Sequence, residues 1–156
     1  MIDIEKLPIS KIQHIGIVVR DANKAVEFCE TLGIGPWKPL KEIRVIERIY
    51  KGKPANDIKL EVRFTQWGLI QVEFLQPGGG PSPWQEFLET NGEGLQHVAF
   101  SMNDLNELNK EVSELEKKGL QVIYQAKFDN GGGAAYVDAR KEIGLVFELF
   151  TSPCLQ

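Results

Sequence analysis

The alternation of apolar and polar positions produces the same strand pattern twice along the chain. Residues 12–17 (Ile-Gln-His-Ile-Gly-Ile) and 95–100 (Leu-Gln-His-Val-Ala-Phe) are short, apolar and rich in residues that favour strands. Their histidines, His14 and His97, lie 83 residues apart (97 − 14) and are the only two in the chain. The chain therefore contains an internal repeat.

Each copy of the repeat closes with a second matching strand that carries one acidic residue. Residues 70–75 (Ile-Gln-Val-Glu-Phe-Leu) correspond to residues 145–150 (Leu-Val-Phe-Glu-Leu-Phe), which places Glu73 and Glu148 at equivalent positions. The histidine and the glutamate are separated by 59 residues (73 − 14) in the first copy and by 51 (148 − 97) in the second. The two copies therefore differ mainly in the length of their loops.

Between these two strands each copy has a helix and room for two further strands. Asp21 is the expected N-cap of a helix over 22–32 and Asn103 that of a helix over 104–118, since each helix then ends before a glycine. Further strands are expected over 44–50, 59–65, 121–127 and 134–138. The unit is βαβββ, present twice, which predicts an α+β fold.

We expect one domain built of two modules. Its 156 residues suit a single domain. Module 1 covers about 10–77 and module 2 about 93–151. They are joined by the Gly/Pro linker 77–83, which can sustain neither a helix nor a strand. A short helix over 83–90 is expected to follow the linker.

Composition narrows the class of partner. The net charge of −4 argues against nucleic acid, which needs a basic face. No apolar run approaches the ~20 residues of a membrane span. Residues 1–10 lack the apolar core of a signal peptide. Cys29 and Cys154 have no metal-like spacing and are expected to be reduced thiols. We therefore expect a cytoplasmic protein that acts on a small molecule.

Strand alternation places the two histidines and two glutamates on one face of the sheet. Within residues 12–19 the all-aliphatic face suits packing against a helix, which leaves His14 on the opposite, concave face. The same alternation puts His97, Glu73 and Glu148 on that concave face. Two carboxylates buried there would repel each other, and one would be forced to take up a proton.

A divalent cation would remove that repulsion and would use the neutral imidazoles as donors. Two imidazoles and two carboxylates suit Co, Ni, Zn, Mn or Fe. The alternative interpretation is that the histidines are hydrogen-bonded core residues and the glutamates face solvent. The recurrence of the same pair of residues in both copies favours a metal site formed by His14, Glu73, His97 and Glu148.

These motifs resemble those of the vicinal oxygen chelate, or glyoxalase and bleomycin-resistance, superfamily. The resemblance rests on residues 13–19 with Asp21 and the following helix, on 94–100 with Asp104, on 72–77 and on 147–149. It covers nearly the whole chain. It implies that the two modules form an open β-cup around the metal and that the protein is a homodimer.

Within this superfamily the chain is most similar to methylmalonyl-CoA epimerase. Residues 73–77, the glycine-rich linker, the helix 83–90 and residues 94–97 follow the order of that subfamily. The chain departs from the pattern at Gln96, where many epimerases have a second histidine, and at the aromatic Trp37 and Trp67. These departures concern the substrate more than the metal.

The resemblance implies that the enzyme stabilises an enolate, as an epimerase or isomerase of an acyl-CoA such as methylmalonyl-CoA. Glu148 is then the expected base, because a metal-bound carboxylate can dissociate and take a proton. Glu61, on the expected strand 59–65, is the candidate second acid, and its alternative role is an exposed strand residue. Two other functions stay open: a glyoxalase I-like lyase or another metalloenzyme on the same scaffold, and a non-catalytic, resistance-type ligand-binding protein.

Overall fold

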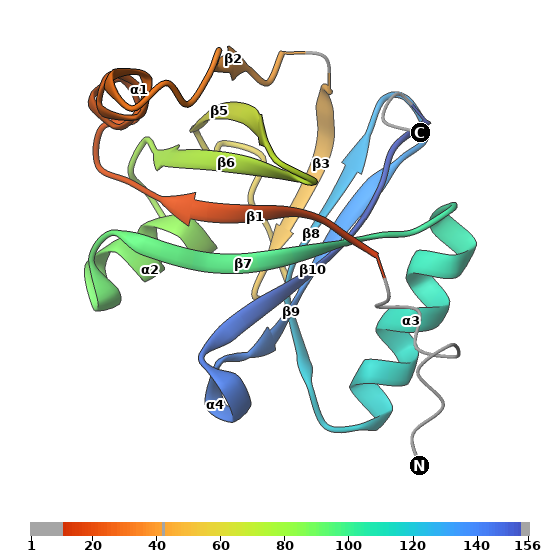
Figure 1. The fold of residues 1–156 in the computed structure, drawn as a ribbon. Coiled ribbons are helices and arrows are strands. Elements are labelled where there is room, and N and C mark those ends of the chain that lie inside the picture. The colour runs from red at the N-terminus through yellow and green to blue at the C-terminus, as the bar shows by residue number, and fades with distance from the viewer. Residues whose placement is uncertain (1–10, 42, 154–156) are drawn as a thin grey trace.

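The computed structural model of the chain describes residues 11–41 and 43–153 (Figure 1). The expectations for residues 1–10 and for Cys154 lie outside these residues. Cys29 is a buried free thiol. None of the helices in the described ranges is both long enough and apolar enough to cross a membrane.

The described residues form ten strands and four helices. The strands are β1 (Ile12–Val18), β2 (Lys38–Pro39), β3 (Val45–Tyr50), β4 (Lys53–Pro54), β5 (Leu60–Trp67), β6 (Ile70–Pro77), β7 (Gly94–Ser101), β8 (Gln121–Phe128), β9 (Gly133–Ala139) and β10 (Leu145–Thr151). The helices are α1 (Ala22–Thr31), α2 (Pro83–Asn91), α3 (Leu105–Lys117) and α4 (Arg140–Ile143). The strands and longer helices expected from the sequence are confirmed to within a few residues at each end.

All ten strands form one mixed, open sheet with the order β2-β5-β6-β1-β7-β10-β9-β8-β3-β4. The first strands of the two halves, β1 and β7, pair antiparallel at its centre. Each is flanked by the closing strand of its own half in parallel, β6 beside β1 and β10 beside β7. The predicted α+β fold of two βαβββ modules forming an open cup is therefore confirmed.

Two strands of the first half, β3 and the two-residue β4, lie at the far edge of the second half. β3 pairs antiparallel with β8, with Arg48 opposite Ala126 and Tyr50 opposite Tyr124. Figure 1 shows β3 crossing to β8, away from the centre of the sheet. We still propose one domain made of a module over about 10–77 and a module over about 93–151. In that division, β3 is the segment through which the first module completes the second.

The helices begin at capping side chains. The Lys24 backbone N–H donates to Asp21 Oδ1 at 3.0 Å, which confirms Asp21 as the N-cap of α1. The expectation of Asn103 as the N-cap of α3 is wrong: Asp104 caps this helix and accepts from the Glu107 N–H at 2.8 Å. The Glu107 carboxylate accepts from the Asn103 N–H at 2.5 Å, and the helix starts one residue later than expected.

The helices α1 and α3 cover the convex face of the sheet. α1 packs on β5 and β6, and α3 packs on β8, β9 and β10 (Figure 1). Val19 and Phe74 lie under α1, and Phe100 and Leu149 lie under α3. The predicted division of the strands into an apolar helix-facing side and a concave side is therefore confirmed. The concave side keeps its own apolar cluster, which includes Trp84 of α2.

Candidate metal centre

The structure brings the four predicted side chains together on the concave face. The Nε2 atoms of His14 and His97 are 3.3 Å apart. Glu148 Oε2 lies 2.9 Å from His14 Nε2 and 3.0 Å from His97 Nε2. Glu73 Oε2 lies 3.5 Å from His14 Nε2. All four side chains are buried.

These separations fit the edges of a coordination polyhedron. Two ligand atoms that each lie about 2.1 Å from one ion are about 3.0–3.4 Å apart at tetrahedral or octahedral angles. His14, Glu73 and His97 each offer a ligand atom, and these atoms lie within 4.8 Å of one another. Glu148 contacts both imidazoles. The donor set therefore fits a divalent cation, while the binding of one stays a prediction.

The register of the central strands explains how the four residues converge. On one row across the sheet, Gly16 of β1 lies between Glu73 of β6 and His97 of β7. On the next row, Ala99 of β7 lies between His14 of β1 and Glu148 of β10. Each histidine is thus separated by one small residue from the glutamate of the other half.

Gly16 is small because the ring of His97 occupies the space beside it. A Cβ atom at Gly16 would lie 2.0 Å from Cε1 and 2.3 Å from Nε2 of that ring. The glycine therefore provides the space in which one imidazole leans toward the other.

Each histidine is also held by the glutamine that precedes it. Residues adjacent on a regular strand face opposite sides, but the β1–β7 register shifts between Ile12 and His14 and between Gly16 and Ile17. These shifts leave Gln13 and Gln96 as extra residues in their strands, in the manner of β-bulges. Such bulges re-aim side chains next to functional sites.

The two glutamines contact the same atom of the two imidazoles. Gln13 Oε1 is hydrogen-bonded to His14 Nδ1, and Gln96 Oε1 lies 2.9 Å from His97 Nδ1. Gln96 is itself fixed by its Nε2, which donates to Pro83 O at 3.0 Å. An amide oxygen can only accept, so each Nδ1 carries a proton, and each Nε2 is the nitrogen that would present its lone pair to a bound cation.

Charge dominates the titration of the cluster. Burial opposes the charged imidazole of His14, but the carboxylates of Glu73 and Glu148 outweigh burial and raise its pKa to about 9. Burial would raise the pKa of Glu148, yet the neighbouring His14 and His97 lower it to about 2. In the absence of a cation, a proton on His14 compensates these carboxylates. The pocket is thus arranged to hold positive charge.

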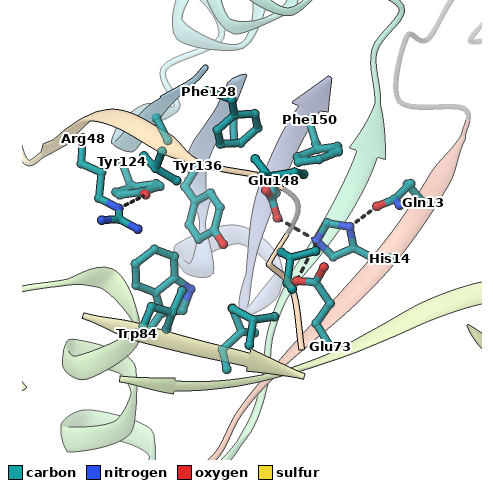
Figure 2. A pocket seen from close by; sticks show the side chains of 18 residues that line it. Gln13, His14, Arg48, Glu73, Trp84, Tyr124, Phe128, Tyr136, Glu148 and Phe150 are labelled. Carbon is teal, nitrogen blue, oxygen red and sulfur yellow. Dashed lines mark hydrogen bonds and ion pairs between the residues drawn. The ribbon is translucent and has the colours of Figure 1, made fainter. Parts of the chain in front are cut away.

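Three of the four residues line a cavity of about 250 Å³ (Figure 2). His14, Glu73 and Glu148 line one side of it. Most of the remaining lining is apolar or aromatic and includes Leu60, Val62, Leu75, Trp84, Tyr124, Phe128, Tyr136 and Phe150. Burial raises the pKa of the Tyr124 hydroxyl to about 12, so this hydroxyl stays protonated at neutral pH. The cavity can therefore enclose a small, partly apolar molecule beside the candidate metal ligands.

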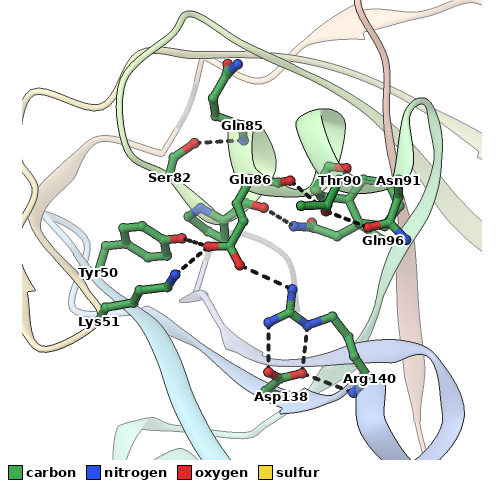
Figure 3. A network of polar contacts seen from close by, with 12 residues as sticks. Tyr50, Lys51, Ser82, Gln85, Glu86, Thr90, Asn91, Gln96, Asp138 and Arg140 are labelled. Atoms are coloured by element: carbon green, nitrogen blue, oxygen red, sulfur yellow. Dashed lines mark hydrogen bonds and ion pairs between the residues drawn. The ribbon is translucent and has the colours of Figure 1, made fainter.

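A network of polar contacts fixes the aromatic wall of this cavity (Figure 3). Glu86, on α2 with Trp84, accepts hydrogen bonds from Tyr50 Oη and from Lys51 Nζ, the latter at 2.6 Å. Arg140 Nη1 lies 3.6 Å from the other oxygen of Glu86, and Arg140 pairs with Asp138 at 2.8 Å. The network ties α2 to the ends of β3 and β9.

The structure does not bring Glu61 to the site. Leu60 and Val62 of β5 line the cavity, so alternation turns Glu61 and Arg63 to the convex face. There the two side chains form an ion pair, and that of Glu61 is 41% exposed. The expectation of Glu61 as a second acid is thus corrected. Arg48, by contrast, lines the cavity and was missed by sequence reasoning, although its strand was predicted.

Comparisons with known proteins agree with the fold. Residues 13–137 match the profile of the Glyoxalase/Bleomycin resistance protein/Dioxygenase superfamily. The chain is 29% identical over 143 residues to YqjC, an uncharacterized protein of Bacillus subtilis. The aligned region covers 90% of this chain and 91% of the relative. The chain is 26% identical over 116 residues to the human mitochondrial methylmalonyl-CoA epimerase. Here the aligned region covers 74% of this chain and 57% of the relative.

The solved structures share the fold. A methylmalonyl-CoA epimerase in complex with methylmalonyl-CoA and NH4+ superposes with a TM-score of 0.63 at 21% identity, over 95% of this chain and 98% of that one. At this identity the likeness extends to the fold and to nothing finer.

Proposed function

Since this chain belongs to the Glyoxalase/Bleomycin resistance protein/Dioxygenase superfamily, we propose that it is a metal-dependent epimerase or isomerase that transfers a proton alpha to a carbonyl group. The observation that carries the proposal is the convergence of two imidazole and two carboxylate groups at 2.9–3.5 Å in a buried site. His14, Glu73, His97 and Glu148 would hold one Co, Ni, Zn, Mn or Fe ion.

A bound cation of this kind supplies Lewis-acid stabilisation of the negative charge that develops on a carbonyl oxygen. The chain's own residues supply the rest. Gln13 and Gln96 keep the imidazoles in one tautomer, as their contacts with Nδ1 indicate. The aromatic and aliphatic walls exclude water from the carbon that loses its proton.

Glu148 is proposed as the group that takes the alpha proton. It lines the cavity and is deprotonated at neutral pH because His14 and His97 lower its pKa. An epimerase needs a second proton carrier on the opposite side of the substrate. With Glu61 on the convex face, Glu73 is the other carboxylate among the described lining residues, and it comes from the opposite half of the sheet.

The proposed substrate class is an acyl-CoA, with methylmalonyl-CoA as the first compound to test. This proposal is supported by the named activity of the human relative at 26% identity. The cavity of about 250 Å³ suits an acyl group, so the CoA moiety would lie outside it. We also propose that the protein is cytoplasmic and that it forms a homodimer. Light scattering of the purified protein would test the homodimer.

Two measurements on untagged protein test the proposal in sequence. Metal analysis should find close to one equivalent of transition metal, which Glu148→Gln should lose or strongly reduce. Methylmalonyl-CoA in deuterium oxide should then exchange its alpha proton in the presence of wild-type protein. Glu61→Gln serves as the matched control and should retain both properties.

The outcomes separate the alternatives. If the protein contains no metal and still binds small molecules, the proposal of a metalloenzyme would be refuted. That result would favour a non-catalytic ligand-binding protein. Full metal content without exchange above the buffer rate would refute an epimerase of this substrate and redirect the search to other carbonyl compounds or to a glyoxalase-like lyase.

A further inference from the structure

Arg48 lies in the cavity across from the candidate metal ligands. Figure 2 shows its side chain beside Tyr124, with Tyr136 and Trp84 between it and the cluster formed by His14 and Glu73. It comes from β3, the strand that joins the edge of the second half. The cavity therefore has two chemically different ends.

The guanidinium of Arg48 is oriented by neutral groups. Its Nε donates to the Tyr124 hydroxyl at 3.3 Å, and its Nη1 donates to Ile58 O at 3.1 Å. None of the ion pairs between described residues includes Arg48. The side chain is half-buried, positively charged and held in place, and its charge has no carboxylate partner within the described part of the chain. Such a charge in an apolar wall favours an anionic ligand.

The charge of the whole cavity leads to the same conclusion. Its charged lining groups are Arg48, the carboxylates of Glu73 and Glu148, and the imidazole of His14. A divalent cation bound by neutral imidazoles would cancel the two carboxylates and leave the single positive charge of Arg48. A carboxylate at the Arg48 end of the ligand would compensate this charge.

We propose that Arg48 binds a carboxylate of the substrate. The substrate is then a carbonyl compound whose carbon chain ends in this carboxylate, away from the carbonyl group. The inference rests on the proposed function, because the metal ligands are assigned the carbonyl end. It narrows the substrate class from acyl compounds in general to carboxylate-terminated ones. Arg48 is then a specificity-determining residue that acts at a distance from the reacting carbon.

Two probes that share a chelating head and chain length isolate this role. 2-Oxoglutarate and 2-oxopentanoate have the same 2-oxo acid head and differ at the far end, which is a carboxylate in the first and a methyl group in the second. Their affinities for cobalt-loaded protein are measured by calorimetry. Since a charge-assisted hydrogen bond contributes about 1.5–3 kcal/mol, the wild-type protein should bind 2-oxoglutarate at least about 10-fold more tightly.

Arg48→Gln should abolish this preference and leave the affinity for 2-oxopentanoate unchanged, while Arg48→Lys should retain part of it. Arg44→Gln is the matched control, because Arg44 is an exposed arginine on the segment just before β3. It should bind both probes as the wild-type protein does. Circular dichroism confirms that each variant is folded.

A preference that persists in Arg48→Gln, the absence of any preference in the wild-type protein, or no binding of either probe would overturn the inference. The cobalt content of each sample separates this result from a failure of the proposed function. If the protein takes up no cobalt, the comparison is repeated on metal-free protein. A preference lost only with Arg48 would still support the carboxylate site, while the metal proposal would fail.

Discussion

Gly16 of β1 and His97 of β7 are complementary in shape: the imidazole ring fills the volume in which any side chain at position 16 would stand. A Cβ there would lie 2.0–2.5 Å from three atoms of the ring. The two residues come from different halves of the chain, so the small residue of one copy accommodates the histidine of the other. A side chain at position 16 would therefore displace one of the candidate metal ligands.

Gly16→Ala should displace the ring of His97 and thereby lower metal affinity by at least about 10-fold. Loss of a hydrogen bond that only orients a ligand already lowers metal affinity by about 10–100-fold. Competition with a chromogenic chelator measures the affinity. Ala99→Gly is the matched control at the equivalent position of the second copy. It removes a Cβ instead of adding one, and should destabilise the fold by only about 0.5–1 kcal/mol while preserving metal binding. Equal metal affinity in wild type and Gly16→Ala would contradict the prediction.

Gln96→Leu should lower metal affinity by about 10–100-fold, because His97 then loses the acceptor that fixes its tautomer and ring orientation. The control is Gln121→Leu, which alters an exposed glutamine on β8. A variant that binds metal as tightly as the wild-type protein would show that the bulged glutamine has no part in the site.

Glu73→Gln and Glu61→Gln separate the concave from the convex face. The first change removes a charged ligand, so metal affinity should fall further than it does in Gln96→Leu. The second disrupts a partly exposed ion pair with Arg63, which contributes at most about 1 kcal/mol to stability and nothing to the site. Metal analysis and thermal unfolding of both variants check this. Loss of metal in Glu61→Gln would refute the assignment of faces.

Glu86→Gln should lower the free energy of unfolding at pH 7 by about 1 kcal/mol, since the carboxylate accepts from both Lys51 and Tyr50. The hydrogen bonds from Lys51 and Tyr50 hold the pKa of Glu86 below its usual range. The stabilisation of the folded state by the Glu86 carboxylate is therefore present above the pKa of about 4.3 that this group has in the unfolded chain. It is lost as the pH falls through the lower pKa of the folded state. The difference in Tm between wild type and variant should narrow below about pH 4.

Glu89→Gln provides the control on the same helix. Glu89 is exposed and contacts Gln85 at 2.8 Å. Its variant should unfold within about 0.5 kcal/mol of the wild-type protein at pH 7. A Glu86→Gln difference that stays constant down to pH 3 would mean that the carboxylate charge contributes nothing to the network.

The repeat and the convergence of its four polar residues could be predicted because they depend on local rules. Side-chain alternation fixes the face of His14 and His97 wherever the strand is regular, and the aliphatic neighbours identify the buried side. The same rule, applied to Leu60 and Val62, would have placed Glu61 on the convex face. The error at Asn103 was a shift of one residue between two adjacent side chains that can both cap a helix.

Other features depend on contacts that no local pattern encodes. The pairing of β3 with β8 joins residues such as Tyr50 and Tyr124, which are distant in the sequence. Arg48 reaches the cavity only through that pairing, so its strand was predicted while its role was not. The bulges at Gln13 and Gln96 are register shifts between β1 and β7, and they become visible only when the two strands are paired.

The position of β3 also determines which part of the protein can yield to an incoming ligand. The strands that carry the candidate metal ligands are paired on both sides, whereas β3 is held by β8 on one side and by the two residues of β4 on the other. Local opening takes least free energy where neighbours are fewest. Local opening of β3 would therefore carry Arg48 outward, while the strands that carry His14 and His97 stay paired. The proposed carboxylate site and the candidate metal site thus lie on strands of unequal local stability.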